Sequence, residues 1–203
     1  EVCRPDSGEV DLIFHKFNKD NDELKYSSIA EAFADVVKEH GDDIAVNDEK
    51  GVYTYKEIDY RSNILAELLC KNGVKPGDNV VLYGEKSVAM AQAILAVVKV
   101  GAVYIPIDAS EPAYRAEFII ADSGCKAVMY SEVEISEEIR RTSAEKFVYD
   151  LKGCDELEGE TQTFRSVSVD SDAIVYCMYT SGTTGHPKGC KILNKGILRL
   201  ALN

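Results

Sequence analysis

The chain has 203 residues, of which 45% are hydrophobic and 29% are charged, and its formal net charge is −12. This composition is ordinary for a globular protein with a core of its own. The acidic balance argues against a surface for nucleic acid or for anionic membranes, because both require clustered lysine and arginine.

The N-terminal residues 1–25 are polar and weakly patterned, which predicts a linker or lead-in followed by one domain over residues 26–203. The most apolar run, residues 88–98, is too short to span a bilayer. No secretory signal opens the sequence, and the cysteines lack Cys-x-x-Cys spacing, so we expect reduced thiols and a cytoplasmic location. The cysteines are Cys3, Cys70, Cys125, Cys154, Cys177 and Cys190.

The first elements are predicted from capping signals. Ser28 and Glu31 form a capping box that opens a helix, and Gly41 ends it. Residues 44–46 and 52–54 read as the two strands of a hairpin. A second capping box, Thr54-x-x-Glu57, opens a further helix that we expect to stop at Gly73.

Strands and helices then alternate. The predicted elements are strand 79–83, helix 88–100 capped by Ser87, strand 103–107 ended by Pro106, helix 111–121 capped by Ser110, strand 127–130, helix 135–141, strand 147–149 and strand 173–178. This order predicts an α/β fold with a largely parallel sheet, right-handed crossovers and helices on both faces.

The stretch with the clearest chemical meaning is Tyr179-Thr-Ser-Gly-Thr-Thr-Gly-His-Pro-Lys-Gly189. It follows a strand and precedes a second short strand at 190–193. Each position from Thr180 to Gly185 is a hydroxyl residue or glycine, so backbone N–H groups and hydroxyls can approach an anion closely. Lys188 adds a positive charge. The stretch is not the common phosphate loop, which needs Gly-x-x-x-x-Gly-Lys-Ser/Thr.

The sequence of this stretch closely resembles the phosphate-binding signature of the adenylate-forming superfamily, and especially of nonribosomal peptide synthetase adenylation domains. The resemblance implies binding of ATP with Mg²⁺, formation of an acyl-adenylate with release of pyrophosphate, and transfer to a thiol. By the resemblance, Thr180 is the residue expected to touch Mg²⁺, and no catalytic residue is assigned. The residues expected to hold the ATP phosphates are Thr180, Ser181, Gly182, Thr183, Thr184, Gly185 and Lys188.

Two further stretches support the resemblance. Residues 53–58 resemble the first core motif of the adenylation family, and residues 98–108 resemble the second. Pro112, Arg115, Asp122 and Ser123 continue the second match, and Asp108 and Arg115 are interpreted as an ion pair across the loop–helix junction. Their spacing, together with a Phe17-Asn18 lead-in that resembles the segment after a condensation domain, favours enzymes that activate amino acids.

The chain departs from the family at Asn194, where many members carry a histidine; we expect this asparagine to cap the following helix. His186 occupies a position that the motif leaves free and is interpreted as a solvated loop residue. His15 and His40 show no spacing typical of a metal site or a catalytic triad.

The leading interpretation is the N-terminal part of an amino-acid-activating adenylation domain that loads a peptidyl carrier protein on its phosphopantetheine thiol. A D-alanine–carrier-protein ligase and an acyl-CoA ligase remain alternatives, as does a non-catalytic nucleotide-binding or structural module. The helical pattern from residue 195 has no stop signal, so we expect the natural chain to continue and this part alone to be inactive. Neither nucleic acid nor a membrane is expected as a partner.

Overall fold

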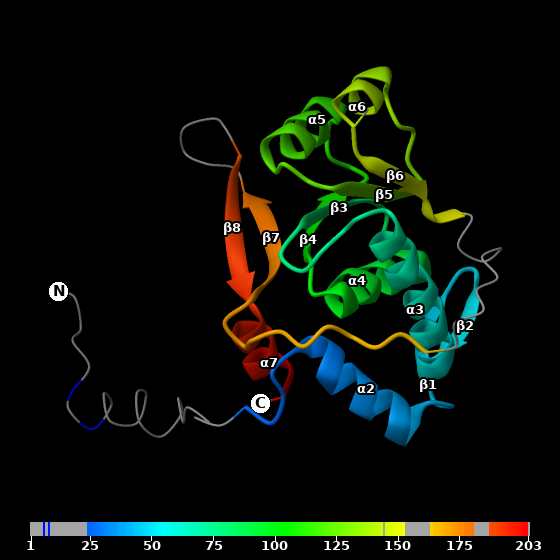
Figure 1. The fold of residues 1–203 in the computed structure, drawn as a ribbon, viewed down its shortest axis with the longest axis vertical. Coiled ribbons are helices and arrows are strands. Elements are labelled where there is room, and N and C mark those ends of the chain that lie inside the picture. Colours follow the sequence, from blue (N-terminus) through cyan, green and yellow to red (C-terminus); the bar gives the residue numbers. More distant parts are fainter. Residues whose placement is uncertain are drawn as a thin grey trace.

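The computed structural model describes residues 6, 8, 24–143, 145–152, 163–180 and 187–202. Its centre is a six-stranded sheet in the order β6-β5-β3-β4-β7-β8 (Figure 1). The strands are β3 (Asn79–Gly84), β4 (Val103–Asp108), β5 (Ala127–Ser131), β6 (Phe147–Asp150), β7 (Ile174–Thr180) and β8 (Lys188–Leu193). All neighbouring strands are parallel except β8, which is antiparallel to β7. The predicted largely parallel sheet is therefore confirmed.

Helices cover both faces of this sheet, as predicted. Figure 1 shows α3 (Tyr55–Lys71) and α4 (Val88–Val100) on one face, and α5 (Ala113–Asp122) and α6 (Glu137–Thr142) on the other. The strand order explains this division. The chain moves from β3 to β4 in one direction and from β4 back past β3 to β5 in the opposite direction. Right-handed crossovers in opposite directions place their helices on opposite faces.

Two hydrophobic cores follow from the alternation of side chains along the strands. On β3, Val80 and Leu82 pack with α3 and α4, whereas Val81 and Tyr83 pack with α5 and α6. Every one of these side chains is buried. Strands buried on both faces have to be apolar at nearly every position, which is why β3 reads as a continuous apolar run.

Capping signals predicted three helix starts correctly, at Ser28, Thr54 and Ser87. Helix α2 (Ile29–His40) begins after Ser28, whose hydroxyl accepts from the N–H of Glu31 at 3.2 Å. The reciprocal half of that box is displaced by one residue, because the Glu31 carboxylate accepts from the N–H and the hydroxyl of Ser27. At α3 both halves of the box between Thr54 and Glu57 are present.

Two helices on the opposite face of the sheet, α5 and α6, start at other residues than predicted. Helix α5 begins at Ala113, with Pro112 before it and no side-chain cap, so the prediction that Ser110 caps this helix is wrong. The Ser110 hydroxyl and N–H both donate to the Asp108 carboxylate, a local turn that competes with capping. Helix α6 begins at Glu137 and is capped by Ser136.

Pro106 does not end its strand, which continues to Asp108 in parallel register with β3. It has a different effect. Pairing between β4 and β7 is confined to Tyr104 and Tyr176, whose rings stack at 5.2 Å. Backbone groups alternate between the two neighbours of a strand, so the next β4 residue facing β7 is Pro106, which has no N–H to donate. Beyond this point β7 has no ladder with β4.

A buried charge joins the two helices on the first face. Lys99 of α4 is only 3% exposed, and its ammonium donates to the Asp59 carboxylate at 2.7 Å. The same ammonium donates to the Ser62 hydroxyl at 2.7 Å and to the Asn63 amide oxygen at 2.6 Å, all on α3. Burial lowers the pKa of Lys99, and the Asp59 carboxylate opposes that shift. These bonds satisfy a charge that would otherwise be very costly to bury.

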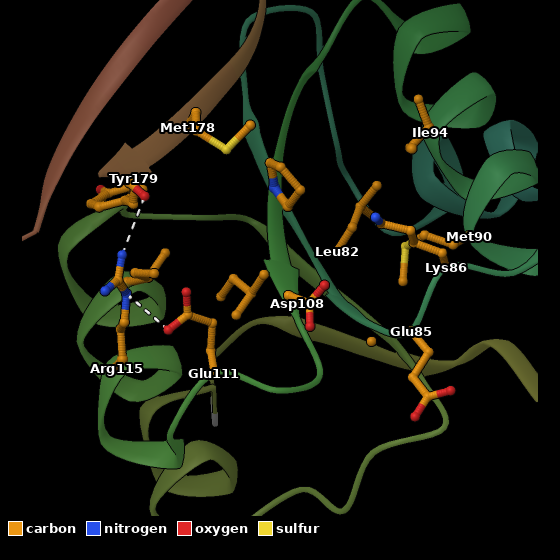
Figure 2. Close-up of a pocket in the computed structure, with 14 residues that line it drawn as sticks. Leu82, Glu85, Lys86, Met90, Ile94, Asp108, Glu111, Arg115, Met178 and Tyr179 are labelled. Atoms are coloured by element: carbon orange, nitrogen blue, oxygen red, sulfur yellow. Dashed lines mark hydrogen bonds and ion pairs between the residues drawn. The ribbon is translucent and has the colours of Figure 1, made fainter. Parts of the chain in front are cut away.

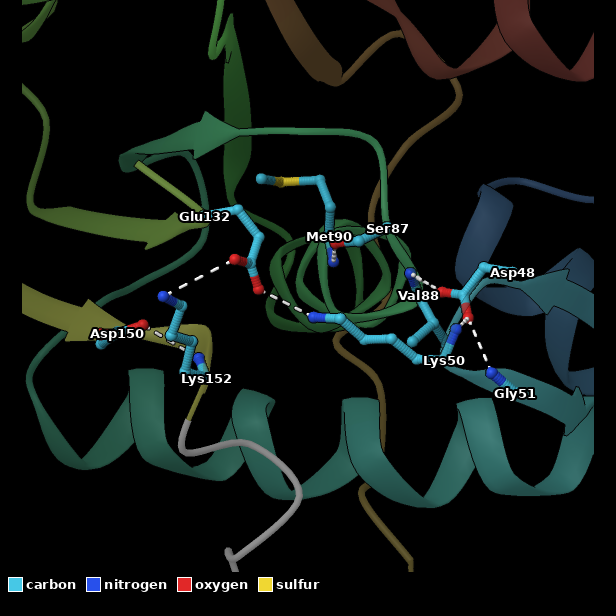
Figure 3. Close-up of polar contacts among 9 residues, drawn as sticks. All are labelled: Asp48, Lys50, Gly51, Ser87, Val88, Met90, Glu132, Asp150 and Lys152. Atoms are coloured by element: carbon cyan, nitrogen blue, oxygen red, sulfur yellow. Dashed lines mark hydrogen bonds and ion pairs between the residues drawn. The ribbon is translucent and has the colours of Figure 1, made fainter. Parts of the chain in front are cut away.

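The predicted hairpin consists of β1 (Ile44–Asp48) and β2 (Gly51–Thr54), and polar contacts attach it to the main sheet (Figure 3). The Asp48 carboxylate accepts from the N–H of Val88, the first residue of α4. From the turn, the Lys50 ammonium donates to Glu132, just after β5, at 2.8 Å. Lys152, which follows β6, lies 3.6 Å from the other oxygen of the same carboxylate. The hairpin is thus fixed beside the carboxyl ends of the parallel strands.

Asn194 is the first residue of α7 (Asn194–Leu202), and its side chain does not cap that helix. Its amide oxygen accepts from the N–H of Ile29 in α2, and its amide nitrogen donates to the carbonyl of Ala173, both at 3.4 Å. The side chain is only 3% exposed. The capping prediction is therefore wrong, and Asn194 connects α2 to the start of β7.

Among the described residues, none of the helices has both the length and the apolar character needed to cross a membrane.

Candidate functional site

The predicted phosphate-binding stretch lies between two antiparallel strands. Thr180 ends β7, Lys188 begins β8, and these two residues are register partners. Both are exposed at the carboxyl edge of the parallel sheet. Within the described residues, the Lys188 ammonium makes no hydrogen bond or ion pair, so its charge is available to an anion. The other predicted phosphate contacts, from Ser181 to Gly185, and His186 lie outside the described residues.

Next to this hairpin, a crevice of about 360 Å³ opens at the carboxyl ends of β3, β4 and β7 (Figure 2). The connections leaving β3 and β4 run to opposite faces of the sheet, so this is the topological switch point at which α/β sheets commonly bind ligands. Its floor is apolar and its rim is charged. The apolar residues are Leu82, Met90, Ile94, Ile107, Ile119 and Met178, and the charged residues are Glu85, Lys86, Asp108, Glu111 and Arg115.

The predicted ion pair between Asp108 and Arg115 is not formed. Arg115 pairs instead with Glu111, one turn earlier on the chain, with Nε 3.2 Å from Oε2 but outside hydrogen-bonding geometry. The Asp108 carboxylate accepts two bonds from Ser110, which lower its pKa. Nη2 of Arg115 donates to the backbone carbonyl of Tyr179 at 3.4 Å, along one side of the crevice (Figure 2).

Tyr179, directly before Thr180, is also held by its phenol hydroxyl. Its hydroxyl donates to the Asp122 carboxylate at 2.7 Å. Burial and then this carboxylate raise the pKa of Tyr179, so the phenol stays protonated as the donor. Arg115 and Asp122 are seven residues apart on α5, a spacing that puts them on one helix face. That spacing is the signal that sequence reasoning could have used to connect them.

The crevice itself was missed by sequence reasoning. Polar residues directly follow two strands, Lys86 after β3 and Asp108 at the end of β4, and this pattern signals the carboxyl edge of a sheet. This signal alone does not predict a crevice, because it also requires that β3 and β4 be neighbours, and the sequence does not give the strand order. Met178, 44% exposed at the wall of the crevice, carries no sequence signal of its own.

The described residues do not form a metal site built from protein side chains alone. Among the described residues, no group of three or more histidine, cysteine, aspartate or glutamate side chains is placed to hold a metal ion. Thr180 offers one neutral exposed hydroxyl. Mg²⁺ is usually bound by one or two carboxylates together with phosphate and water, so Thr180 fits as one ligand of a phosphate-bound Mg²⁺ that would also need a carboxylate from outside this stretch.

Comparison with known proteins identifies relatives along most of the chain. Residues 33–203 match the family model described as AMP-binding enzyme. Malpibaldin synthetase of Mortierella alpina is 34% identical over 197 residues, which is 96% of this chain and 4% of that protein. Zwittermicin A synthase ZmaJ of Bacillus cereus is 33% identical over 172 residues, or 84% of this chain and 32% of that protein. The chain thus spans only a part of these relatives.

Solved structures share the fold at lower identity. The N-terminal subdomain of Klebsiella oxytoca NpsA, in complex with 3-hydroxybenzoyl-AMSN, aligns with a TM-score of 0.74 and 22% identity over 86% of this chain and 43% of that one. The nonribosomal peptide synthetase FmoA3, in an α-methyl-L-serine-AMP bound form, aligns with a TM-score of 0.76 and 22% identity over 89% of this chain and 19% of that one. With the family match, this shared fold shows that the chain belongs to the AMP-binding enzyme family and has the fold of the N-terminal subdomain of adenylate-forming enzymes.

Proposed function

We propose that the protein carrying this chain uses ATP to convert an amino-acid carboxylate into an aminoacyl-adenylate, with release of pyrophosphate, in the cytoplasm. The observation that carries the proposal is the β7–β8 hairpin. It presents Thr180 and Lys188 side by side at the carboxyl edge of a parallel sheet, at the two ends of the phosphate-binding stretch, in a chain of the AMP-binding family.

The role of this stretch is electrostatic. Negative charge develops on the departing pyrophosphate, and fixed donors aimed at that charge stabilise the transition state. Lys188 supplies a cation that lacks a competing partner within the described residues. Because the whole chain carries a net charge of −12, attraction of ATP depends on these local donors. Mg²⁺, held by the phosphates and by the Thr180 hydroxyl, would neutralise further charge there.

The proposed substrate is an amino acid, and the proposed acceptor is the phosphopantetheine thiol of a peptidyl carrier protein. The support comes from the relatives: malpibaldin synthetase, bacitracin synthase 1 and gramicidin S synthase 2 match 85–96% of this chain at 32–34% identity.

The test is an ATP–pyrophosphate exchange assay of the full-length protein with each common amino acid, followed by loading of its carrier protein with the best substrate. We expect exchange with at least one amino acid and an acylated phosphopantetheine arm. Free coenzyme A with fatty or aryl acids serves as the comparison. Turnover of only those acids would replace the proposal by an acyl-CoA ligase. No ATP-dependent exchange with any acid would favour a non-catalytic nucleotide-binding module.

A further inference from the structure

The hairpin that carries the phosphate-binding stretch is weakly attached to the sheet on its inner side. The one residue pair between β4 and β7 in the described part of the chain is Tyr104 with Tyr176. The next β4 residue that faces β7 is Pro106, which has no N–H to donate. The last part of β7, from Cys177 to Thr180, therefore pairs only with β8. This end of β7 and its partner β8 extend beyond the ladder with β4, and the crevice lies in the resulting gap, between Ile107 and Met178.

We propose that Arg115 is a positioning residue that replaces the missing ladder and holds the base of the phosphate-binding stretch against the sheet. This inference rests on the proposed function for its effect on ATP, but not for its effect on the hairpin. Nη2 of Arg115 donates to the carbonyl of Tyr179, the residue before Thr180, at one side of the crevice (Figure 2). A donor from α5 thus meets a backbone acceptor at the position where β4 no longer reaches β7.

The surroundings of Arg115 orient its side chain. Glu111 lies one turn earlier on the chain, with its carboxylate 3.2 Å from Nε, and the Arg115 side chain is only 22% exposed. An arginine presents several donors in a planar fork, so one edge faces Glu111 while the other faces Tyr179. Lysine has a single ammonium on a flexible stem and would not hold both partners in this fixed geometry.

Two further contacts limit how Tyr179 can move. Its hydroxyl donates to Asp122, two turns further along α5, so the same helix holds both the backbone and the ring end of this residue. Its ring also lies beside its cross-strand partner Gly189, where an added Cβ would lie 3.4 Å from the ring and 2.8 Å from the sulfur of Cys177. Through these contacts with Tyr179, α5 fixes the position of the adjacent Thr180 and of its register partner Lys188.

The direct test is hydrogen exchange on the full-length protein with Arg115→Met, which keeps an apolar stem but removes every donor. We expect the amides of the hairpin, including Thr180 and Lys188, to exchange about three- to tenfold faster. This factor corresponds to the loss of one long, partly exposed hydrogen bond from a charged donor. Amides of β3 and β5 should be unchanged. Arg141→Met is the matched control, since Arg141 pairs with Glu138 on α6 at 3.0 Å.

The second readout is kinetic. In pyrophosphate exchange we expect Arg115→Met to raise the KM for ATP by about three- to tenfold, at an unchanged melting temperature and with the KM for the amino acid unaffected. Arg141→Met should alter neither. If the wild-type protein shows no exchange at all, the proposed function fails, while hydrogen exchange still decides the role of Arg115.

Two results would overturn the inference. Unchanged exchange of the hairpin amides would mean that Arg115 serves only its ion pair with Glu111. Faster exchange throughout the sheet with a lower melting temperature would mean that Arg115 stabilises the whole fold rather than the hairpin.

Discussion

Lys188 is the residue whose charge the proposed reaction uses most directly. Charge-assisted contacts to phosphate are typically worth about 1.5–3 kcal/mol. We therefore predict that Lys188→Ala in the full-length protein raises the KM for ATP about 10- to 100-fold while the melting temperature stays the same, because the side chain is exposed and packs against no core. The measurement is pyrophosphate exchange at varied ATP concentration.

The matched control for that variant is Lys191→Ala, which removes the same charge from an exposed position of the same strand. Since Lys191 lies three residues further along β8, we expect little change in the KM for ATP. Equal effects of the two substitutions would show that the net charge of the hairpin matters and that the position of Lys188 does not.

Lys99 presents the opposite case, a lysine whose role is structural. Lys99→Met would leave Asp59, Ser62 and Asn63 without their common donor, and breaking a buried ion pair by removing one partner typically costs about 3–5 kcal/mol. Because Asp59 is 27% exposed, we expect the lower end, a loss of about 3 kcal/mol in the free energy of unfolding. Equilibrium urea unfolding measures it.

Lys71 offers the comparison for this measurement. It pairs with Glu67 at 2.9 Å on the surface of α3, with its own side chain 68% exposed. Exposed pairs contribute little, so Lys71→Met should lower the free energy of unfolding by less than about 0.5 kcal/mol. Similar losses for both variants would contradict the importance assigned to the buried contacts of Lys99.

At the scale of single elements, the capping box of α3 makes stability depend on pH. The Thr54 N–H and then its hydroxyl donate to the Glu57 carboxylate and lower the pKa of Glu57 below its ordinary value of 4.5. A carboxyl whose pKa is lower in the folded protein stabilises it above the unfolded value, and this contribution disappears as the pH falls through the folded value.

We therefore predict that Glu57→Gln lowers the free energy of unfolding by about 0.5 kcal/mol at pH 7, a value typical of a charge at a helix N-terminus. The difference between the variant and the wild type should shrink as the pH falls below 4.5. Urea unfolding at several pH values measures it. A difference independent of pH would show that the charge of Glu57 does not stabilise α3.

Pro106 of β4 shows that a missing backbone donor affects only the neighbouring strand that it faces. Pro106 was expected to end β4, since proline cannot donate to a ladder. It sits within the strand because the flanking residues Ile105 and Ile107 direct their backbone groups toward β3, whereas Pro106 faces β7, where its N–H is missing. The sequence identified the missing donor, but which neighbour loses it depends on the strand order.

For the molecule as a whole, this chain matches 43% of the NpsA N-terminal subdomain and a smaller share of the peptide synthetases. We predict that the chain alone gives pyrophosphate exchange at background level with a mixture of amino acids, because it spans less than half of that subdomain. The full-length protein is the positive control in the same assay. Robust exchange by the chain alone would contradict this.

Local features of this protein could be predicted from its sequence. The capping box at Thr54, the alternation of strands and helices, and the two strands that flank the predicted phosphate-binding stretch all depend on residues a few positions apart, whose hydrogen bonds and periodicity act within one element. The expected start of α5 failed for the same local reason, because Ser110 bonds to Asp108 rather than to the helix.

Only the tertiary structure decided which distant residues meet. Neighbouring strands β3 and β4 create the crevice, and the burial of Lys99 follows from the packing of α4 on α3. Asn194 bonds to Ile29, 165 positions away, and Arg115 reaches Tyr179, 64 positions away, rather than Asp108. Such partners depend on strand order and helix packing, which bring together segments that no short-range pattern relates.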